Sequence, residues 1–405
     1  MMFPPINEQI DIIKKGTEEL ISEEELVTKL ERSEKTGVPI RVKQGFDPTA
    51  PDIHLGHTVG IRKLREFQEL GHTIVLIIGD YTGMVGDPSG KSETRPRLTY
   101  DKVMENAKTY EEQFFKILDR SKTEIHYNGE WFAKMQFDEI MTLAAKFTVA
   151  RILERDDFTK RYKEGIPISL HEFFYPLMQG YDSVAIKSDV ELGATEQKFN
   201  LLAARHVQRE YDQEPQVVLT LPVLEGIDGT QRMSKSLGNY VGIDEAPVDM
   251  FGKIMSIPDN LIYKYFMLVT DYHLDQLEDV RKRLEDSKVN PMIIKKELAC
   301  TIVSIYHSEN DAVMAQESFE QVFSKKEFPD DIEEISVDVA AGELLLVKLL
   351  SDNKLVSSNG EGRRLIKQGA IKINDEKISD INYCLSSGEF ITKVGKRRFV
   401  KFIVK

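Results

Sequence analysis

The chain contains little cysteine and little tryptophan. Its 405 residues include two cysteines, Cys300 and Cys384, and one tryptophan. The two cysteines lie far apart and form no CxxC pair, which excludes a disulfide framework and a cysteine-based zinc site. We expect both to be structural thiols.

Long apolar runs are also missing from the sequence. No stretch of about eighteen apolar residues occurs, and the N-terminal residues lack the charged-then-apolar layout of a secretion signal. We therefore expect a cytoplasmic protein without a membrane partner. The length exceeds that of one ordinary core, so two or three domains are expected.

Acidic residues outnumber basic ones except near the end of the chain. The formal net charge is -13, whereas residues 361–405 carry eleven Lys or Arg against five Asp or Glu. The acidic body argues against indiscriminate coating of nucleic acid, and the basic end is typical of a surface that meets a phosphate backbone. The alternative is a solvated, charged surface.

The first part of the chain predicts a βαβ unit. Residues 39–46 indicate a strand, residues 57–70 a helix, and the apolar run 73–79 a buried parallel strand. Ligands bind beyond the carboxyl ends of such strands. The turn 47–57 and the loop 79–92 fall there.

The other segments predict a mainly helical remainder. Apolar residues recur at helical spacing over about 8–36, 99–164 and 246–328, a buried strand is expected at 217–224, and 327–331 indicates a linker. We predict an α/β protein with three parts: a Rossmann-like parallel-sheet catalytic domain (1–245) with a helical insertion (about 100–165), an all-helical domain (246–330) and a small α+β domain (338–405).

Two short motifs contain groups that could bind the same polyanion, a nucleotide triphosphate. His54-Leu55-Gly56-His57 stands at a helix start, where imidazoles and backbone N–H groups can meet a triphosphate and the glycine lets adenine approach. Arg232-Met233-Ser234-Lys235-Ser236 lies in a glycine-flanked loop that can close a lysine over the leaving phosphates. Histidines at a helix start also serve as caps, so the first motif alone is weak evidence.

Together the motifs resemble the two signatures of the class I aminoacyl-tRNA synthetases. The preceding Gly45-Phe46-Asp47-Pro48-Thr49 narrows the resemblance to the bacterial tyrosyl-tRNA synthetases, and it runs through nearly the whole chain. It implies a tyrosine–tRNA ligase that converts tyrosine and ATP to tyrosyl-adenylate and pyrophosphate and then transfers the tyrosyl group to the 3′ end of its tRNA. It further implies a homodimer formed by the insertion, anticodon recognition by the helical domain, RNA binding by the last domain, and Mg²⁺ on the ATP phosphates with no protein-bound metal or organic cofactor.

The resemblance also assigns residues to ATP. The implied catalytic residues are His54, His57, Lys91, Arg95, Arg232 and Lys235, and the implied ATP-binding residues are Gly45, Asp47, Thr49, His54, Gly56, His57, Gly193, Glu196, Met233, Ser234, Lys235 and Ser236. Lys91 and Arg95 are expected to grip pyrophosphate from a loop, and ordinary surface charge is their alternative. That loop is not a P-loop, since Val85 replaces the required glycine and Pro88 lacks an N–H.

A polar stripe predicts the amino-acid pocket. Tyr175, Gln179 and Asp182 are spaced i, i+4 and i+7, so they share one helix face, and polar groups facing a core cost free energy unless they bind something. The resemblance places Tyr175 and Gln179 with Asp87 around the tyrosine ammonium, Asp182 at the phenol, and Gln197 at the carboxylate. A structural hydrogen-bond network is the alternative.

The sequence departs from the family pattern at three positions. Glu196 stands in place of the usual aspartate and Ala194 in place of a common glycine. Lys43 stands where many members of the resembled family have a tyrosine that contacts the substrate phenol together with the aspartate, so the second phenol contact stays unassigned.

The basic end shows a helix followed by a strand. The expected helix carries its arginines on the outer face, turns at Gly369, and offers Arg363, Arg364, Lys367 and Lys372 to RNA. By resemblance this domain recognises structured RNA by shape and phosphates.

Three rival functions stay open from the sequence alone. The sister tryptophan enzyme normally lacks the basic tail and would not present the polar stripe. A cytidylyl- or adenylyltransferase with an HxGH motif is usually much shorter. An RNA-binding regulator built on an inactive synthetase is disfavoured by the intact motifs.

Overall fold

The computed structural model describes residues 3–48, 53–87, 98–324, 333–337, 344–374, 376–385, 388–395 and 398–404. They form two compact units, Met1–Val313 and Met314–Lys405. Each unit has its own sheet. The predicted linker at 327–331 lies outside the described residues.

A six-stranded sheet forms the centre of the first unit, with strand order β1-β6-β5-β2-β3-β4. Its strands are β1 (Glu19–Ile21), β2 (Arg41–Phe46), β3 (Thr73–Ile78), β4 (Thr123–Tyr127), β5 (Val190–Ala194) and β6 (Val217–Leu221). Strand β1 runs antiparallel to β6, and every other neighbouring pair is parallel. The predicted Rossmann-like parallel sheet is thereby confirmed.

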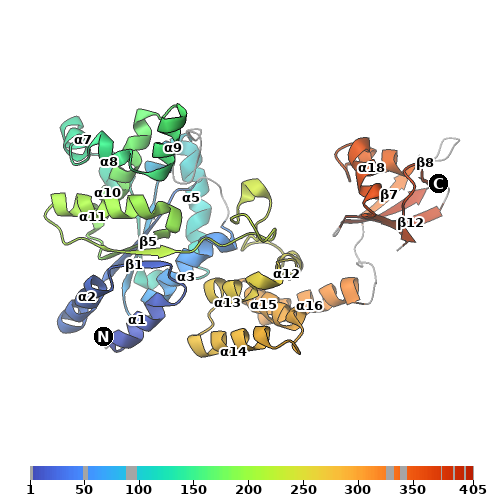
Figure 1. Cartoon of the computed structure of the whole chain (residues 1–405), viewed down its shortest axis with the longest axis horizontal. Helices are drawn as coiled ribbons and strands as arrows, with labels where there is room; N and C mark the ends of the chain where they lie inside the picture. The colour runs from blue at the N-terminus through green and yellow to red at the C-terminus, as the bar shows by residue number, and fades with distance from the viewer. Residues whose placement is uncertain are drawn as a thin grey trace. The chain divides into compact units, whose positions relative to one another are not determined.

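Helices cover both faces of this sheet. They include α1 (Ile6–Lys14), α2 (Glu23–Thr36), α3 (Leu55–Glu69), α4 (Thr82–Val85), α5 (Tyr100–Phe114), α10 (Phe174–Ile186) and α11 (Lys198–Glu210). Figure 1 shows α10 and α11 on one side of the sheet and α1 and α2 on the other. Because both faces are covered, the central strands are continuous apolar runs rather than alternating ones, and all five residues of β6 are buried.

Two strands lie within segments whose sequence predicts helices. Strand β1 separates α1 from α2, and β4 pairs with β3 inside the segment 99–164. Both are edge strands whose residues are only half-buried, so neither shows the apolar run that predicts a strand. The remainder of that segment is helical, with α5, α6 (Gly129–Phe132), α7 (Phe137–Ala144), α8 (Val149–Ile152) and α9 (Asp156–Glu164).

The segment after β6 is helical, as predicted. It contains α12 (Pro247–Met255), α13 (Ile262–Val269), α14 (Leu274–Glu285), α15 (Pro291–Tyr306) and α16 (Glu309–Ser324). Proline at the first turn of α12 and of α15 suits a helix start, where no N–H partner is needed. None of the helices in the described part of the chain is long and apolar enough to cross a membrane.

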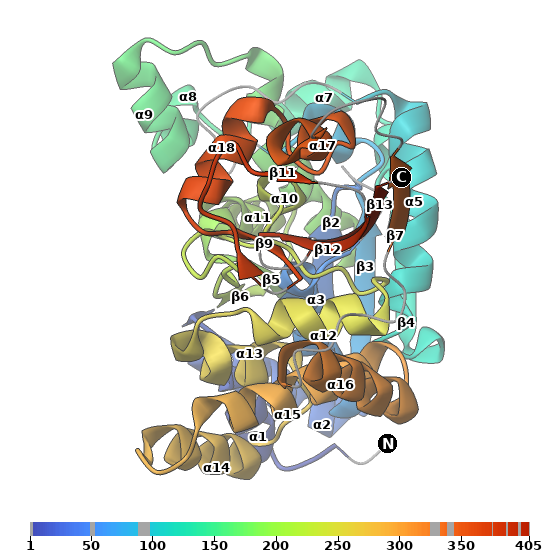
Figure 2. The ribbon, with the colours of Figure 1, turned by 90° about the vertical axis from the view of Figure 1, so that its right-hand side faces the viewer.

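The second unit is a small α+β fold. Its five-stranded sheet has the order β10-β9-β12-β13-β7. The strands of the unit are β7 (Glu333–Val337), β8 (Leu344–Leu345), β9 (Ile371–Ile373), β10 (Glu376–Lys377), β11 (Cys384–Leu385), β12 (Gly388–Val394) and β13 (Arg398–Val404). Helices α17 (Leu346–Asp352) and α18 (Asn359–Lys367) lie against one face of this sheet (Figure 2) and share its apolar core. The predicted α+β fold of this region is confirmed.

Candidate active site

The first motif lies at the N-terminal end of α3, the helix that follows β2 in the chain. His54 is the N-cap, its N–H donates to His57 Nδ1 at 3.3 Å, and the two rings stack with centroids 3.9 Å apart. The buried His54 Nδ1 has no hydrogen-bond partner among the described residues. A helix start with an orphaned imidazole nitrogen suits an anionic ligand.

Both imidazoles are held in the neutral form. Burial, with His57 and Lys235 nearby, lowers the pKa of His54 to about 2. Burial and Lys235 lower the pKa of His57 to about 4. At neutral pH each ring therefore carries one N–H donor and no charge.

The second motif is held against the first. The Gly56 N–H donates to Met233 Sδ at 3.3 Å, and Met233 is buried. Asn239 fixes the loop, since its Oδ1 accepts from the Ser234 N–H at 2.8 Å and its Nδ2 donates to the Arg232 carbonyl at 3.0 Å. The structure thus brings together two motifs that lie far apart in sequence.

The remaining residues of this loop are half-buried or exposed. Lys235 Nζ lies 5.9 Å from the centroid of the Tyr240 ring. Arg232 pairs with Glu196 Oε1 at 2.7 Å, and the Ser234 and Ser236 hydroxyls lie 2.9 Å apart. Glu196, predicted for ATP, is therefore joined to the loop that carries the lysine.

A small cavity opens beyond the carboxyl ends of β2, β3 and β5. Its lining residues are Gly45, Phe46, Asp47, Ile77, Gly79, Thr82, Tyr175, Gln179, Asp182, Leu192 and Gln197. Four of the five residues predicted for tyrosine line it. The fifth, Asp87, accepts a hydrogen bond from Gln197 Nε2 at 3.1 Å and so lies beside it.

Asp182 is a buried acid of this cavity that two donors hold in place. Trp131 Nε1 donates to Oδ1 at 2.9 Å, and Asn128 Nδ2 donates to Oδ2 at 3.4 Å. Burial raises the pKa of Asp182 to about 7, against the opposing effects of the Lys43 charge and of these two donors. An acceptor of this kind suits a phenolic hydroxyl.

Tyr175 and Asp47 form a second polar group of the cavity. The Tyr175 hydroxyl donates to Asp47 Oδ2 at 2.8 Å, and the Thr82 hydroxyl donates to Asp47 Oδ1 at 2.7 Å. Burial, together with the Asp47 carboxylate, raises the pKa of Tyr175 well above its usual range. Since its proton goes to Asp47, the Tyr175 oxygen keeps lone pairs for a donor such as an ammonium.

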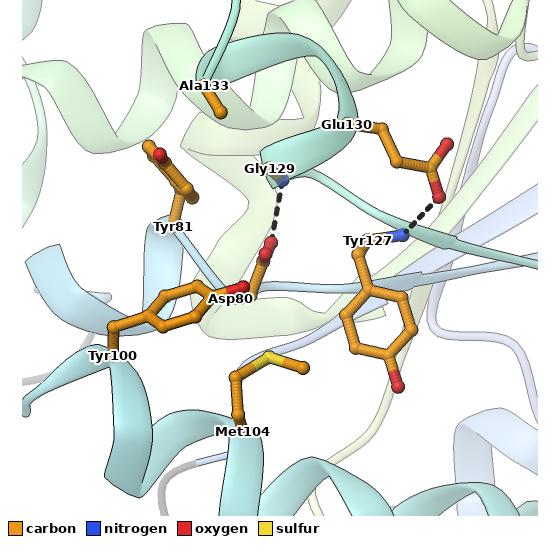
Figure 3. Close-up of a pocket in the computed structure, with 8 residues that line it drawn as sticks. All are labelled: Asp80, Tyr81, Tyr100, Met104, Tyr127, Gly129, Glu130 and Ala133. Atoms are coloured by element: carbon orange, nitrogen blue, oxygen red, sulfur yellow. Dashed lines mark hydrogen bonds between the residues drawn. The ribbon is translucent and has the colours of Figure 1, made fainter.

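A larger cavity, of about 360 Å³, lies next to α5 and α6 (Figure 3). It is lined by Asp80, Tyr81, Tyr100, Met104, Tyr127, Gly129, Glu130 and Ala133. The Gly129 N–H donates to Asp80 Oδ1 at 2.7 Å, and the Tyr127 N–H donates to Glu130 at 3.0 Å. No predicted site residue is among its described lining residues, whereas the smaller cavity is lined by Gly45, Asp47 and four of the residues predicted for tyrosine.

Comparison with known proteins identifies the family. The family model "tRNA synthetases class I (W and Y)" matches residues 35–324, and "Tyrosine--tRNA ligase SYY-like C-terminal domain" matches residues 324–400. The tyrosine–tRNA ligase of Carboxydothermus hydrogenoformans is 54% identical over 100% of this chain and 99% of its own length. That of Thermotoga maritima is 52% identical over 97% of each chain. The chain belongs to the tyrosine–tRNA ligase family. This membership confirms the predicted resemblance and the predicted ligase activity, with ATP as a substrate.

Solved structures show the same fold as this member of the tyrosine–tRNA ligases. The tyrosyl-tRNA synthetase of Archaeoglobus fulgidus, complexed with L-tyrosine, has a TM-score of 0.63 and 23% identity, covering 77% of this chain and 99% of its own. The tyrosyl-tRNA synthetase of Aeropyrum pernix has a TM-score of 0.61 and 18% identity, covering 79% and 98%. At these identities the likeness confirms the fold class alone.

Three residues predicted for this tyrosine–tRNA ligase lie outside the described residues, namely Thr49, Lys91 and Arg95. Conversely, Asn128 and Trp131, which donate to Asp182, were not among the predicted site residues. The one available signal was that Trp131 is the only tryptophan of the chain.

Proposed function

We propose that the smaller cavity binds tyrosine, with its phenol toward Asp182 and its ammonium toward Tyr175, Gln179 and Asp87. The observation that supports this orientation most directly is the buried Asp182 carboxylate, held by two donors inside the cavity. A carboxylate accepts from a phenol, whereas bound phenylalanine would desolvate this carboxylate without giving it a third donor. Gln197, in the short turn after β5, also lines the cavity and is proposed to orient the substrate carboxylate.

ATP is proposed to lie over the start of α3, next to this cavity. Its triphosphate would meet the N–H groups of the helix start and the imidazoles of His54 and His57. The adenine approaches Gly56, and Gly45, Gly193, Glu196 and the second motif complete the site. Mg²⁺ would arrive with ATP, held by the phosphates themselves, and would neutralise part of their charge.

No side chain acts as a nucleophile in the proposed activation step. A tyrosine carboxylate oxygen attacks the α-phosphorus in line, and the bond to the pyrophosphate oxygen breaks, which gives tyrosyl-adenylate and pyrophosphate. Catalysis then consists of positioning and charge stabilisation. Lys235, with Arg232, stabilises the charge that grows on the leaving pyrophosphate, and Lys91 and Arg95 are proposed to help.

The other parts of the chain are proposed to bind RNA. Arg363, Arg364 and Lys367 are exposed on α18, and Lys372 lies in the adjacent strand β9. Such a basic face can follow the phosphates of a tRNA. The helices between Pro247 and Ser324 are proposed to recognise the anticodon region.

A homodimer is proposed to form through the helical insertion at about 100–165 and the turn that follows it. Large apolar side chains are exposed there, with Phe137 at 76%, Tyr162 at 70% and Leu170 at 77%. Large apolar side chains that are this exposed within one segment are typical of an association surface. Because a tRNA ligase acts where translation occurs, we propose a cytoplasmic location.

Exchange of pyrophosphate into ATP, measured with each of the twenty amino acids, tests the proposed pocket. Exchange is expected with tyrosine and at most a trace with phenylalanine or tryptophan. Equal exchange with phenylalanine would show that Asp182 does not select tyrosine over phenylalanine. Equal exchange with tryptophan would favour assignment to the sister tryptophan enzyme.

A further inference from the structure

A buried ion pair lies behind the tyrosine pocket. Lys43 of β2 and Glu191 of β5 face each other across a parallel strand pair, their Nζ and Oε1 atoms are 3.0 Å apart, and both side chains are 0% exposed. Neither is among the described residues that line the pocket. A buried pair contributes little stability compared with well-packed apolar side chains, so stability alone is a weak explanation of it.

The three N–H groups of the Lys43 ammonium are all directed to protein partners. It donates to the Gln179 carbonyl at 3.0 Å and to Ser183 Oγ at 2.8 Å, and it pairs with Glu191. An ammonium has three N–H groups. Lys43 therefore does not replace the tyrosine that contacts the phenol in many relatives.

Glu191 fixes which way the Gln179 amide faces. Gln179 Nε2 donates to Glu191 Oε1 at 2.9 Å. A carboxylate can only accept, so the amide nitrogen must face Glu191 and Gln179 Oε1 must face away from it. Gln179 lines the pocket, and among the described residues none donates to its Oε1, which leaves this acceptor for the substrate ammonium.

The same pair controls the charge around Asp182. The Lys43 ammonium favours the ionised form of Asp182, and the Glu191 carboxylate opposes it. The other titratable groups that face Asp182 are Tyr175, on the same helix, and Asp47, which is bonded to Tyr175. Lys43 also donates to the hydroxyl of Ser183, which follows Asp182 on α10, so this cation is held against the segment that carries Asp182. Without Lys43, the buried carboxyl groups of Asp182 and Glu191 would lose a positive charge that both share.

We propose that the Lys43–Glu191 pair is a positioning device for tyrosine, in which Glu191 orients Gln179 toward the ammonium and Lys43, bonded to Ser183 next to Asp182 in the chain, supplies a positive charge near the carboxyl group that meets the phenol. This inference rests on the proposed orientation of tyrosine in the pocket. It makes Lys43 and Glu191 specificity-determining residues that act through others and touch no substrate.

Three variants of the full-length chain test the proposal by tyrosine-dependent pyrophosphate exchange between about pH 5.5 and 9. In the wild-type protein kcat/KM for tyrosine should fall on the acid side of a certain pH, and this fall is called the acid limb. Lys43→Met should move the acid limb to a higher pH by about one unit or more, because the Glu191 carboxylate then raises the pKa of Asp182 without an opposing cation. Lys43→Arg keeps the charge and should restore the wild-type limb. Lys43→Met/Glu191→Met, in which no buried charge is left alone, should raise the KM for tyrosine about tenfold or more while the KM for ATP stays nearly constant.

A second buried ion pair provides the matched control. Arg161 Nη1 and Glu172 Oε2 lie 2.6 Å apart, the side chains are 1% and 3% exposed, and neither residue is among the described residues that line the pocket. Arg161→Met/Glu172→Met makes the same chemical change elsewhere. It should leave the KM for tyrosine and the acid limb unchanged.

The outcomes separate this inference from the proposed pocket. If the wild-type protein shows no exchange with tyrosine, the proposed pocket fails and the inference with it. If the wild-type protein exchanges normally but Lys43→Met and the double variant keep its acid limb and its KM for tyrosine, the inference alone is overturned. An equal loss with the control pair would also overturn it, because the effect would then be general destabilisation.

Discussion

Gly56 and Met233 are joined by a hydrogen bond from the backbone N–H of the glycine to the sulfur of the methionine, 3.3 Å long and spanning 177 residues of sequence. The contact docks the second motif on the helix start of the first. A side chain at position 56 would come within 3.4 Å of Met233 Cβ and 3.0 Å of the His54 ring, so the glycine also makes room for this approach. Lys235 follows two residues later, close enough to act on a triphosphate at the same helix start.

Replacing Lys235 by alanine should slow adenylate formation far more than it weakens tyrosine binding. Lys235 acts on charge that develops only in the transition state, so its loss should lower the rate roughly 10²–10³-fold, as for an oxyanion-hole donor. Rapid-quench measurement of adenylate formation gives the rate, and the dependence on tyrosine concentration gives the binding.

A second lysine beside the same tyrosine ring serves as the control. Lys253 Nζ lies 4.7 Å from the Tyr240 centroid and is paired with Glu245. Lys253→Ala should keep a nearly normal rate. If the two alanine variants were equally fast, Lys235 would be no more than one of two cations packed on Tyr240.

Replacing Asp182 by asparagine should weaken tyrosine binding by about 1–3 kcal/mol, because the phenol loses a charged acceptor. The pH dependence should change as well. In the wild-type protein Asp182 takes up a proton as the pH falls through about 7, so kcat/KM for tyrosine should fall below that pH, whereas the variant should lack this limb.

Asp80→Asn is the matched control for this change. Asp80 is also buried and accepts from a backbone N–H, but it belongs to the other cavity (Figure 3). Its replacement should leave the KM for tyrosine unchanged. A normal KM in the Asp182 variant would exclude this residue from the phenol contact.

The polar stripe of the pocket could be predicted because it is local. Tyr175, Gln179 and Asp182 lie on α10, and helical spacing alone places three such residues on one face. The buried strands β3 and β6 were equally readable, since a continuous apolar run with a glycine or proline after it has few other interpretations.

The partners of that stripe could not be predicted because they are tertiary. Trp131 reaches Asp182 from α6, and Glu191 reaches Gln179 from β5. No period in the sequence connects these positions. Edge strands such as β4 were missed for a related reason, since their half-exposed residues alternate with charged ones and resemble an amphipathic helix end.

The buried His54 should make stability fall in acid. The pKa of His54 is lowered by burial to about 2 in the folded protein, whereas an unfolded histidine titrates near 6.5. The unfolded state therefore binds more protons between these values, so stability rises with pH in that window and is lost as pH falls below about 6.5. At pH 5 the loss from this one group is about 2 kcal/mol.

Urea unfolding of the wild-type protein and of His54→Gln at pH 7.5 and pH 5 measures this contribution. The wild-type protein should lose more stability between the two values than the variant does. Equal losses would mean that the His54 ring is hydrated in the folded protein and titrates normally.

Placing a charge on the exposed apolar side chains of the insertion, or of the turn that follows it, should dissociate the proposed dimer. Leu170 and Phe137 are 77% and 76% exposed, and a carboxylate at either position would have to be desolvated in an interface. Leu170→Glu and Phe137→Glu should shift the mass in sedimentation velocity from dimer to monomer. Val38 is also apolar and is 63% exposed, but it lies outside the insertion. The control variant Val38→Glu should therefore have the same sedimentation mass as the wild-type protein. A dimer that survives both changes would place the interface elsewhere.

Removing the charges of α18 should weaken tRNA charging without affecting tyrosine activation. Arg363, Arg364 and Lys367 are exposed on this helix, which belongs to the second compact unit, whereas both motifs belong to the first. In Arg363→Gln/Arg364→Gln/Lys367→Gln the KM for tRNA should rise while tyrosine-dependent exchange stays normal. Each phosphate contact contributes about 0.7–0.9 to the slope of log affinity against log salt. The slope for tRNA binding should therefore become shallower by about 2–3.

Three exposed lysines of the first unit, Lys35, Lys122 and Lys160, provide the control. Replacing all three by glutamine removes the same charge from the chain. If that variant weakens tRNA binding as much as the α18 variant does, the effect is one of net charge and α18 is a solvated surface.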